Sequence, residues 1–138
     1  MILLDTSGLL AALDASQRTH EQSASTLAAA DPPLLLSPFV LAELDYLLAS
    51  RVGEGARKDL LAEVARGAYL LEPMSGADVG EARKVIQRHA DLGLSLADAS
   101  IVVLAKRRPT RDVLTLDQRH FRILNVDGKP FRLLPADA

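Results

Sequence analysis

Four acidic residues lie either directly after a predicted strand or within an apolar helical stretch. Asp5 directly follows the apolar run that opens the chain, Glu43 and Asp98 lie in apolar helical stretches, and Asp117 follows a predicted strand. Burying a carboxylate is costly unless it is paired or binds a cation. The chain has no Cys, and its three His residues do not match zinc-site spacing, so these oxygen donors suit Mg²⁺ or Mn²⁺. Such an ion polarises a phosphate and activates a water for in-line attack, which predicts metal-dependent chemistry on a phosphate ester.

Two of these acids lie at the ends of predicted strands. An unbroken apolar run closed by Asp5, Thr6 and Ser7 is typical of a buried strand that ends at a polar edge. Asp117 follows the strand that ends at Thr115, and ligands bind outside the carboxyl ends of parallel strands. The hydroxyls of Thr6 or Ser7, and of Thr115, would then orient ligands or water. The alternative is that Asp5 or Thr6 caps the next helix and Asp117 caps a short turn.

The other two acids lie inside predicted helices. At about 100° per residue, apolar side chains surround Glu43 on one helix face, so we expect Glu43 to point inward and Asp45 to point away. Asp98 is the only formal charge in the body of an otherwise apolar helix, which indicates burial. The alternatives are a buried salt bridge for Glu43, although no Lys or Arg lies three or four residues away, and a helix-dipole role for Asp98, three residues after Ser95.

Short apolar segments alternate with helical segments along the chain. The predicted strands are 1–4, 34–36, 69–71, 112–115 and 131–134, the last at a sheet edge. The predicted helices are 8–13, 18–30, 38–51, 55–66, 75–89 and 95–107, followed by a helical turn at 117–121. This βαβ pattern predicts an α/β fold, with a mainly parallel sheet between two helix layers.

Length and composition restrict the class of protein. A chain of 138 residues predicts one domain, and 49% hydrophobic residues suffice for a core. No apolar run approaches the ~18 residues of a transmembrane helix, and the opening run is too short for a signal peptide, so we expect no membrane association. The absence of Cys is consistent with a cytoplasmic protein. No glycine-rich phosphate loop is present.

The charges are unevenly distributed along the chain. The formal net charge is −2, yet residues 106–138 contain eight Lys and Arg against four acids, whereas residues 1–50 contain only one basic residue. Basic residues gathered in one region can form a surface for a polyanion. The alternative is a solvated face with scattered arginines.

Four segments, taken together, resemble the four motifs of PIN-domain ribonucleases. They are Leu4-Asp5-Thr6-Ser7, Ser37-Pro38-Phe39-Val40-Leu41-Ala42-Glu43-Leu44, Leu94-Ser95-Leu96-Ala97-Asp98-Ala99 and Leu114-Thr115-Leu116-Asp117. Their order and spacing are similar to those of VapC toxins from bacterial VapBC toxin–antitoxin modules. The resemblance covers the whole chain, so it implies a single PIN domain over residues 1–138, an α/β/α sandwich with five parallel strands, and a homodimer.

The same resemblance implies an activity and assigns roles to residues. It implies a Mg²⁺- or Mn²⁺-dependent endoribonuclease that cleaves a structured RNA, such as a transfer RNA or a ribosomal RNA loop, and is inhibited by a VapB-type antitoxin. The catalytic and metal-binding acids of the family map onto Asp5, Glu43, Asp98 and Asp117. Thr6 matches the hydroxyl of the first motif, and Thr115 is the polar neighbour of the last acid.

Two other functions are compatible with a fold of this class. One is a non-catalytic module that binds RNA or a protein through the basic region. The complete set of acids favours the enzyme over this module. The other is a phosphohydrolase or phospho-acceptor domain, which also places Asp at a strand end. Many phosphotransferases of that kind need a second Asp two residues later, where this chain has Ser7.

Overall fold

The computed structural model describes all residues, 1–138, and its centre is a five-stranded parallel sheet. The strands are β1 (Ile2–Leu4), β2 (Leu34–Leu36), β3 (Leu70–Leu71), β4 (Asp112–Leu114) and β7 (Arg132–Leu134). They lie in the order β3-β2-β1-β4-β7, and every neighbouring pair is parallel. The predicted fold class is confirmed, including the edge position of the last strand.

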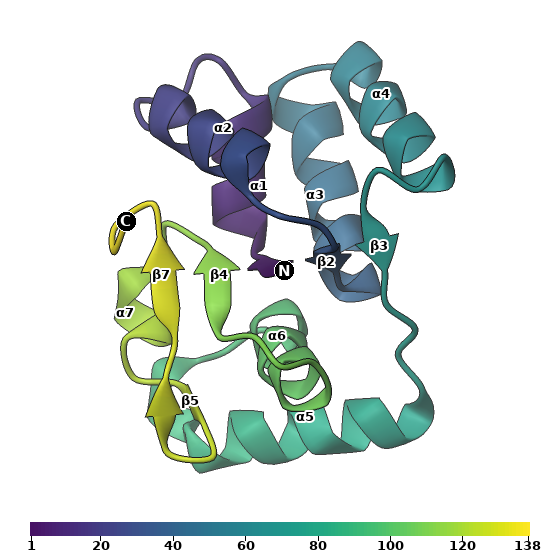
Figure 1. Cartoon of the computed structure of the whole chain (residues 1–138). Helices are drawn as coiled ribbons and strands as arrows, with labels where there is room; N and C mark the ends of the chain where they lie inside the picture. The colour runs from purple at the N-terminus through teal and green to yellow at the C-terminus, as the bar shows by residue number, and fades with distance from the viewer.

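Helices cover both faces of this sheet. They are α1 (Thr6–Leu13), α2 (His20–Ala29), α3 (Pro38–Arg51), α4 (Glu54–Ala65), α5 (Gly76–Arg88), α6 (Leu96–Arg107) and the short α7 (Gln118–Phe121), with a 3₁₀ turn at Ala90–Leu92. Figure 1 shows α1 to α4 grouped above the strands and α5 and α6 below them. None of the helices combines the length and the hydrophobicity of a membrane-spanning segment.

The central strand is buried on both faces because both faces are covered by helices. Leu3 is fully buried, and it pairs with Leu35 of β2 on one side and with Val113 of β4 on the other. A strand with no solvent-facing side needs apolar residues at every position, which explains why the opening run does not alternate. One cluster of 30 buried apolar residues, rich in Leu, Val and Ala, forms the core.

Serine residues fix where three helices begin. The Ser37 hydroxyl accepts a hydrogen bond from the Phe39 amide, and Pro38 takes the first helical position of α3. Ser75 starts α5 and Ser95 starts α6, each with a reciprocal capping box to the Asp three residues later. The helix starts predicted at these positions are confirmed.

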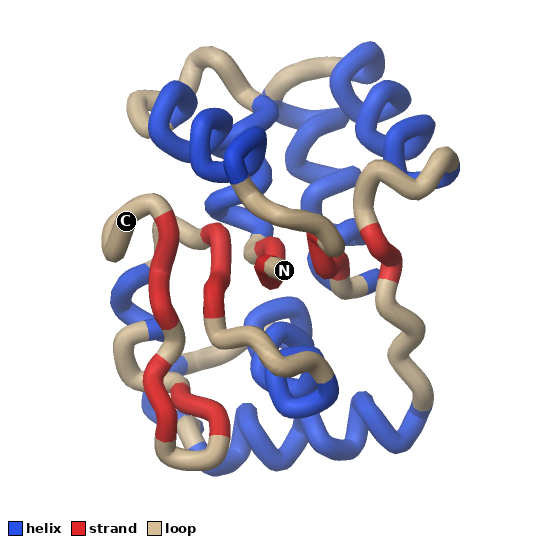
Figure 2. The backbone as a smooth tube through the Cα atoms, in the orientation of Figure 1, coloured by secondary structure: helices blue, strands red, loops and turns tan.

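The sequence reading missed a small antiparallel hairpin before the last strand. It consists of β5 (Asn125–Val126) and β6 (Lys129–Pro130), joined by Asp127 and Gly128, which both have positive φ. Figure 2 shows it at the lower end of β7. An Asp-Gly pair suits this two-residue turn, but each strand is too short to show alternation in the sequence.

Helix α1 begins in close contact with the carboxyl end of β4. Gly8 lies in the first turns of α1, and a Cβ atom there would overlap the backbone carbonyl of Leu114. The absence of a side chain at Gly8 therefore lets α1 start directly against the carboxyl end of β4.

Candidate metal centre

The carboxyl ends of β1 and β4 open onto a cavity of about 330 Å³. It is lined by Asp5, Thr6, Ser7, Leu10, Glu43, Leu47, Arg51, Ser95, Asp98 and Asp117. The structure thus brings all four predicted carboxylates, which span more than 100 residues of sequence, to one place. They arrive from the end of β1, the middle of α3, the start of α6 and the start of α7.

Asp5 is the most deeply buried of the four acids, with an exposed fraction of 3%. Its carboxylate accepts hydrogen bonds from the hydroxyls of Thr115, at 2.6 Å, and Ser7, at 2.9 Å. Burial raises the pKa of the Asp5 carboxyl to about 6, the Thr115 hydrogen bond opposes that rise, and the nearby charge of Asp98 adds to it. Asp5 occupies the N-cap position of α1 but makes no capping hydrogen bond, so the simple capping alternative is wrong.

The hydroxyls around Asp5 connect the ends of two neighbouring strands. Ser7 Oγ accepts a hydrogen bond from the Leu116 amide, and Thr115 Oγ1 accepts one from the Asp117 amide. Ser7 and Thr115 therefore position Asp5 relative to the segment that carries Asp117. Of the two adjacent hydroxyl residues considered from the sequence, Ser7 makes these contacts. Thr6 Oγ1 is buried and has no hydrogen-bond partner.

Glu43 is exposed rather than inward-facing, which corrects the prediction from helical angles. The face of α3 that packs into the core consists of Val40, Leu44 and Leu48, all fully buried. The helix carries apolar residues around much of its circumference, so the angles alone did not identify the packed face. Glu43 nevertheless lines the cavity, on the same face as Arg51 two turns later. The prediction that Asp45 points away from the site agrees with its 2.6 Å ion pair to Arg57.

Asp98 and Asp117 both make the helix-end contacts that the alternatives described. Asp98 accepts a hydrogen bond from the Ser95 amide at 3.1 Å in the capping box of α6. Asp117 accepts one from the His120 amide at 3.0 Å and so caps α7. Capping does not remove either residue from the cavity, since both carboxylates remain part of its lining.

Two residues beside the acids were missed by the sequence analysis. Arg51 lines the cavity and forms no ion pair. The signal in the sequence was its spacing of eight residues from Glu43, which places both residues on the same helix face. His120 lies with Nδ1 2.9 Å from Asp117 Oδ2 and 3.6 Å from Asp98 Oδ2. Its position three residues after Asp117 on a predicted helical turn was the only available signal.

The chemistry of this cavity fits a hard divalent cation. Its carboxylates supply oxygen donors, and none of the four forms an ion pair with Lys or Arg; the only basic side chain within ion-pair distance is the imidazole of His120. Several carboxylates gathered without compensating cations repel one another, and a bound cation removes that repulsion. The unpartnered hydroxyl of Thr6 in the same lining adds a further oxygen without a contact in the protein.

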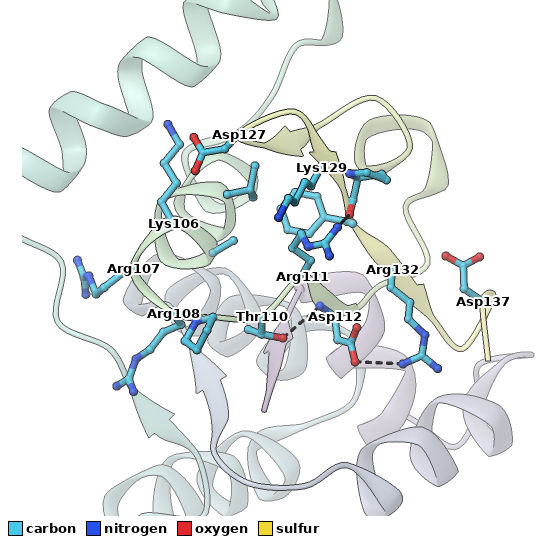
Figure 3. A pocket seen from close by; sticks show the side chains of 15 residues that line it. Lys106, Arg107, Arg108, Thr110, Arg111, Asp112, Asp127, Lys129, Arg132 and Asp137 are labelled. Atoms are coloured by element: carbon cyan, nitrogen blue, oxygen red, sulfur yellow. Dashed lines mark hydrogen bonds and ion pairs between the residues drawn. The ribbon is translucent and has the colours of Figure 1, made fainter.

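The basic residues of the C-terminal third gather mainly at the opposite end of β4. A groove of about 920 Å³ lies there, and we call it the basic groove; its cationic lining is Lys106, Arg107, Arg108, Arg111, Lys129 and Arg132. Figure 3 shows these side chains around the hollow, coming from the end of α6, the following loop, β6 and the start of β7. Asp112, the first residue of β4, lines the groove, whereas Thr115, just past its last residue, binds Asp5.

Half of the cations in the basic groove are neutralised by acids of the same fold. Glu72 is almost fully buried and pairs with both Arg107 and Arg108. Arg107 also pairs with Asp78 at 2.7 Å, and Arg132 pairs with Asp112 at 3.1 Å. These pairs connect the end of α6 to α5 and to the end of β3, and β7 to β4, so half of the positive charge of the groove has a partner within the fold.

The parallel sheet, the helix layers and the acid-lined cavity at the carboxyl edge together define the architecture of a PIN domain. The PIN domain family matches residues 2–126 of the chain. The chain is 40% identical to Ribonuclease VapC26 of Mycobacterium tuberculosis over 135 residues, which covers 97% of this chain and 100% of that protein.

Two solved structures share the fold. Mycobacterium tuberculosis VapC20, described as a Sarcin-Ricin loop cleaving toxin, has a TM-score of 0.79 at 23% identity, covering 85% of this chain and 90% of that one. FitAcB from Neisseria gonorrhoeae has a TM-score of 0.54 at 22% identity, covering 87% of this chain and 99% of that one. This chain therefore belongs to the PIN-domain family and is a homologue of the VapC ribonuclease toxins, that is, an endoribonuclease.

Proposed function

We propose that the protein hydrolyses phosphodiester bonds in a structured RNA, such as a transfer RNA or a ribosomal RNA loop, and so inhibits translation. The observation that carries this proposal is the convergence of Asp5, Glu43, Asp98 and Asp117 on one cavity without a Lys or Arg partner. The substrate class is supported by the similarity to VapC ribonucleases over almost the whole chain.

The four acids would hold Mg²⁺ or Mn²⁺, as is typical of PIN nucleases. An RNA backbone is itself anionic, so carboxylates alone would repel it. When bound, the ion would offset this repulsion, polarise the scissile phosphate and lower the pKa of a water. Ser7 and Thr115 fix the orientation of the Asp5 carboxylate through their hydrogen bonds.

Arg51 supports RNA binding from the edge of this cavity. It is the only Lys or Arg in the lining, and no carboxylate neutralises it. A guanidinium can donate two parallel hydrogen bonds to a phosphate. Arg119, which is exposed on α7 and also unpaired, lies on the segment that follows Asp117 and is a second candidate for a backbone contact.

The direct test is cleavage of labelled transfer and ribosomal RNA by purified protein in Mg²⁺, in Mn²⁺ and in excess chelator. We expect defined fragments with either metal and none in chelator, and no cleavage by an Asp5→Asn variant under any condition. Cleavage that is unchanged in chelator would contradict the metal centre. RNA binding without cleavage in either metal would favour the non-catalytic binding module.

We also propose that the protein forms a homodimer and is inhibited by a VapB-type antitoxin, since VapC homologues pair with antitoxins. Several large apolar side chains remain exposed on α3, α4 and β3, among them Tyr46, Leu61, Leu70 and Leu71. Exposed apolar groups gathered on neighbouring elements are typical of interfaces. Light scattering should give roughly twice the chain mass of 14.8 kDa, and a mass equal to one chain at micromolar concentration would contradict the dimer.

A further inference from the structure

His120 occupies an unusual position beside two of the acids. Its side chain is 15% exposed, and its Nδ1 atom faces Asp117 Oδ2 at 2.9 Å and Asp98 Oδ2 at 3.6 Å. Both ring nitrogens are buried and neither makes a hydrogen bond of acceptable geometry. The short contact to Asp117 therefore lacks the direction that an N–H donor needs.

A buried imidazole without a hydrogen-bond partner is costly, and such groups in native proteins usually have a ligand or a function. A single cation between the ring and the carboxylates would give Nδ1 and both oxygens a shared partner. Atoms bound to one octahedral ion at ~2.1 Å lie ~3 Å apart when adjacent and ~4 Å apart when opposite. The observed 2.9 Å matches the separation of adjacent ligand atoms, and the observed 3.6 Å lies between the two values.

Two further observations point to a ligand at this place. One ligand atom from each of Asp98, Asp117 and His120 can be chosen so that all three lie within 4.8 Å of one another. Thr6 Oγ1, from a residue only 5% exposed, lines the cavity shared by Asp98 and Asp117 and also has no partner. Unpartnered polar atoms of two residues, Thr6 and His120, therefore lie near the same carboxylates.

His120 also determines how Asp117 is held. Its backbone amide donates to Asp117 Oδ1 at 3.0 Å, while its ring lies against Oδ2 of the same carboxylate. The four-residue helix α7 thus keeps this imidazole beside the carboxylate of Asp117. A cation bound to Asp117 through Oδ2 would lie within reach of Nδ1 without a change in the backbone.

We propose that His120 is a nitrogen ligand of the metal centre, alongside Asp98 and Asp117, and that it gives the protein a preference for Mn²⁺ over Mg²⁺. This inference rests on the metal-dependent activity proposed above. Mg²⁺ prefers oxygen ligands and keeps several waters, whereas Mn²⁺, as a transition ion, accepts an imidazole nitrogen more readily than Mg²⁺ does. A site made of carboxylates alone would lack the nitrogen ligand that distinguishes Mn²⁺ from Mg²⁺.

The test is electron paramagnetic resonance of Mn²⁺ bound to the full-length, tag-free protein, with pulsed measurements that detect a coordinated ¹⁴N nucleus. The variants are His120→Gln and, as a matched control, His89→Gln, which replaces a half-buried histidine at the end of α5. We expect a histidine nitrogen coupling in the wild type and in His89→Gln, and none in His120→Gln. Competition with Mg²⁺ should show the Mn²⁺ preference of His120→Gln reduced ~10-fold.

The outcomes separate this inference from the proposed function. Mn²⁺ that binds the wild type and is lost in Asp5→Asn, but shows no histidine nitrogen coupling, would overturn the role of His120 and leave the acid-based metal centre intact. A coupling that survives in His120→Gln would also overturn it. If the wild type binds no Mn²⁺, or Asp5→Asn binds it equally well, both proposals fail together.

Discussion

The two ends of strand β4 carry charge in opposite ways. At the carboxyl end, four carboxylates line one cavity, and the only basic side chain within ion-pair distance of them is the imidazole of His120. At the amino end, six Lys and Arg line the basic groove, and half of them pair with acids of the same fold. The carboxylates of the cavity have no Lys or Arg partner in the fold, so their charge points to a bound ligand. The paired Arg residues of the basic groove are explained by their ion pairs within the fold.

The largest expected effect compares two aspartates with the same local role. Asp98 and Asp78 both close capping boxes, but Asp98 lines the cavity while Asp78 pairs with Arg107. We expect Asp98→Asn to lower RNA cleavage ~100-fold or more and to lose stabilisation by Mn²⁺. In chelator its melting temperature should equal or exceed that of the wild type, because one of several neighbouring like charges is removed.

Asp78→Asn is the matched control for this experiment. It should cleave RNA normally and be less stable than wild type, because it removes the charge that pairs with Arg107. Cleavage assays and thermal melting of both variants measure the two effects. An Asp98→Asn protein that melts well below wild type in chelator yet still cleaves RNA would show that Asp98 is a structural residue and not a metal ligand.

The second prediction is that the two regions respond to pH with opposite signs. Asp5 has a pKa of about 6 in the folded protein, above the ordinary 3.8, so metal-free protein should lose stability as pH rises from about 4 through 6. Asp137 lines the basic groove and has a pKa of about 2, lowered by its ion pair with Arg122, so its contribution is present above pH 4 and is lost as pH falls toward 2.

Urea unfolding in chelator between pH 4.5 and 7.5 measures the first of these signs. Asp5→Asn should be more stable than wild type at the upper pH, by at most about 3 kcal/mol for a shift of roughly two pKa units, and the difference should shrink toward pH 4.5. A constant difference across this range would show that the Asp5 charge is not the cause.

The third prediction concerns the paired cations of the basic groove. Arg108→Met leaves the buried carboxylate of Glu72 with one partner instead of two, which we expect to cost about 2 kcal/mol in the free energy of unfolding. Lys106→Met lies in the same groove and breaks no ion pair, so its effect should stay within about 0.5 kcal/mol. Denaturant unfolding compares the two variants.

These variants also test the hypothesis that the basic C-terminal third holds RNA. If the groove is structural, neither variant should change RNA affinity or its salt dependence. If Lys106→Met weakens RNA binding and flattens the salt dependence without a loss of stability, the unpaired cations of the groove contact phosphates, and the groove is a second nucleic-acid surface.

The smallest predicted effect concerns the single unpaired Arg of the cavity. Arg51→Ala should raise the KM for RNA ~10-fold and change kcat less, because the loss of a phosphate contact weakens binding of the substrate and of the transition state alike. Arg88→Ala is the control, since Arg88 is also an exposed Arg in the last turn of a helix and lies outside the cavity. Equal KM values for the two variants would remove Arg51 from the RNA-binding surface.

Much of the fold follows from local patterns that the tertiary structure does not override. The apolar runs at 2–4 and 34–36 have no polar alternation, which is why they predict strands covered on both faces. Asp5 and Asp117 could be assigned to one edge because the carboxyl ends of neighbouring parallel strands lie side by side. The capping serines Ser37, Ser75 and Ser95 placed three helix starts to within a residue.

The features that were missed depend on contacts between distant segments. The packed face of α3 is set by the elements it meets, so angles along the helix predicted an inward-facing Glu43, whereas this side chain is exposed. Arg107 and Asp78 are 29 positions apart in the sequence, so local patterns do not reveal their ion pair. His120 contacts Asp98 only after α6 and α7 are brought together at the sheet edge, so its place in the site required the folded chain.

Substitution of Gly8 should inactivate the protein in a living cell. Any side chain there would overlap the Leu114 carbonyl and push α1 away from β4, separating Asp5 from Thr115 while leaving every chemical group in place. In a host that expresses this toxin homologue without an antitoxin, surviving colonies should therefore carry substitutions at Gly8 as well as at the acids. Such a survey of escape mutations would identify Gly8 as a residue that contributes to activity only because it has no side chain.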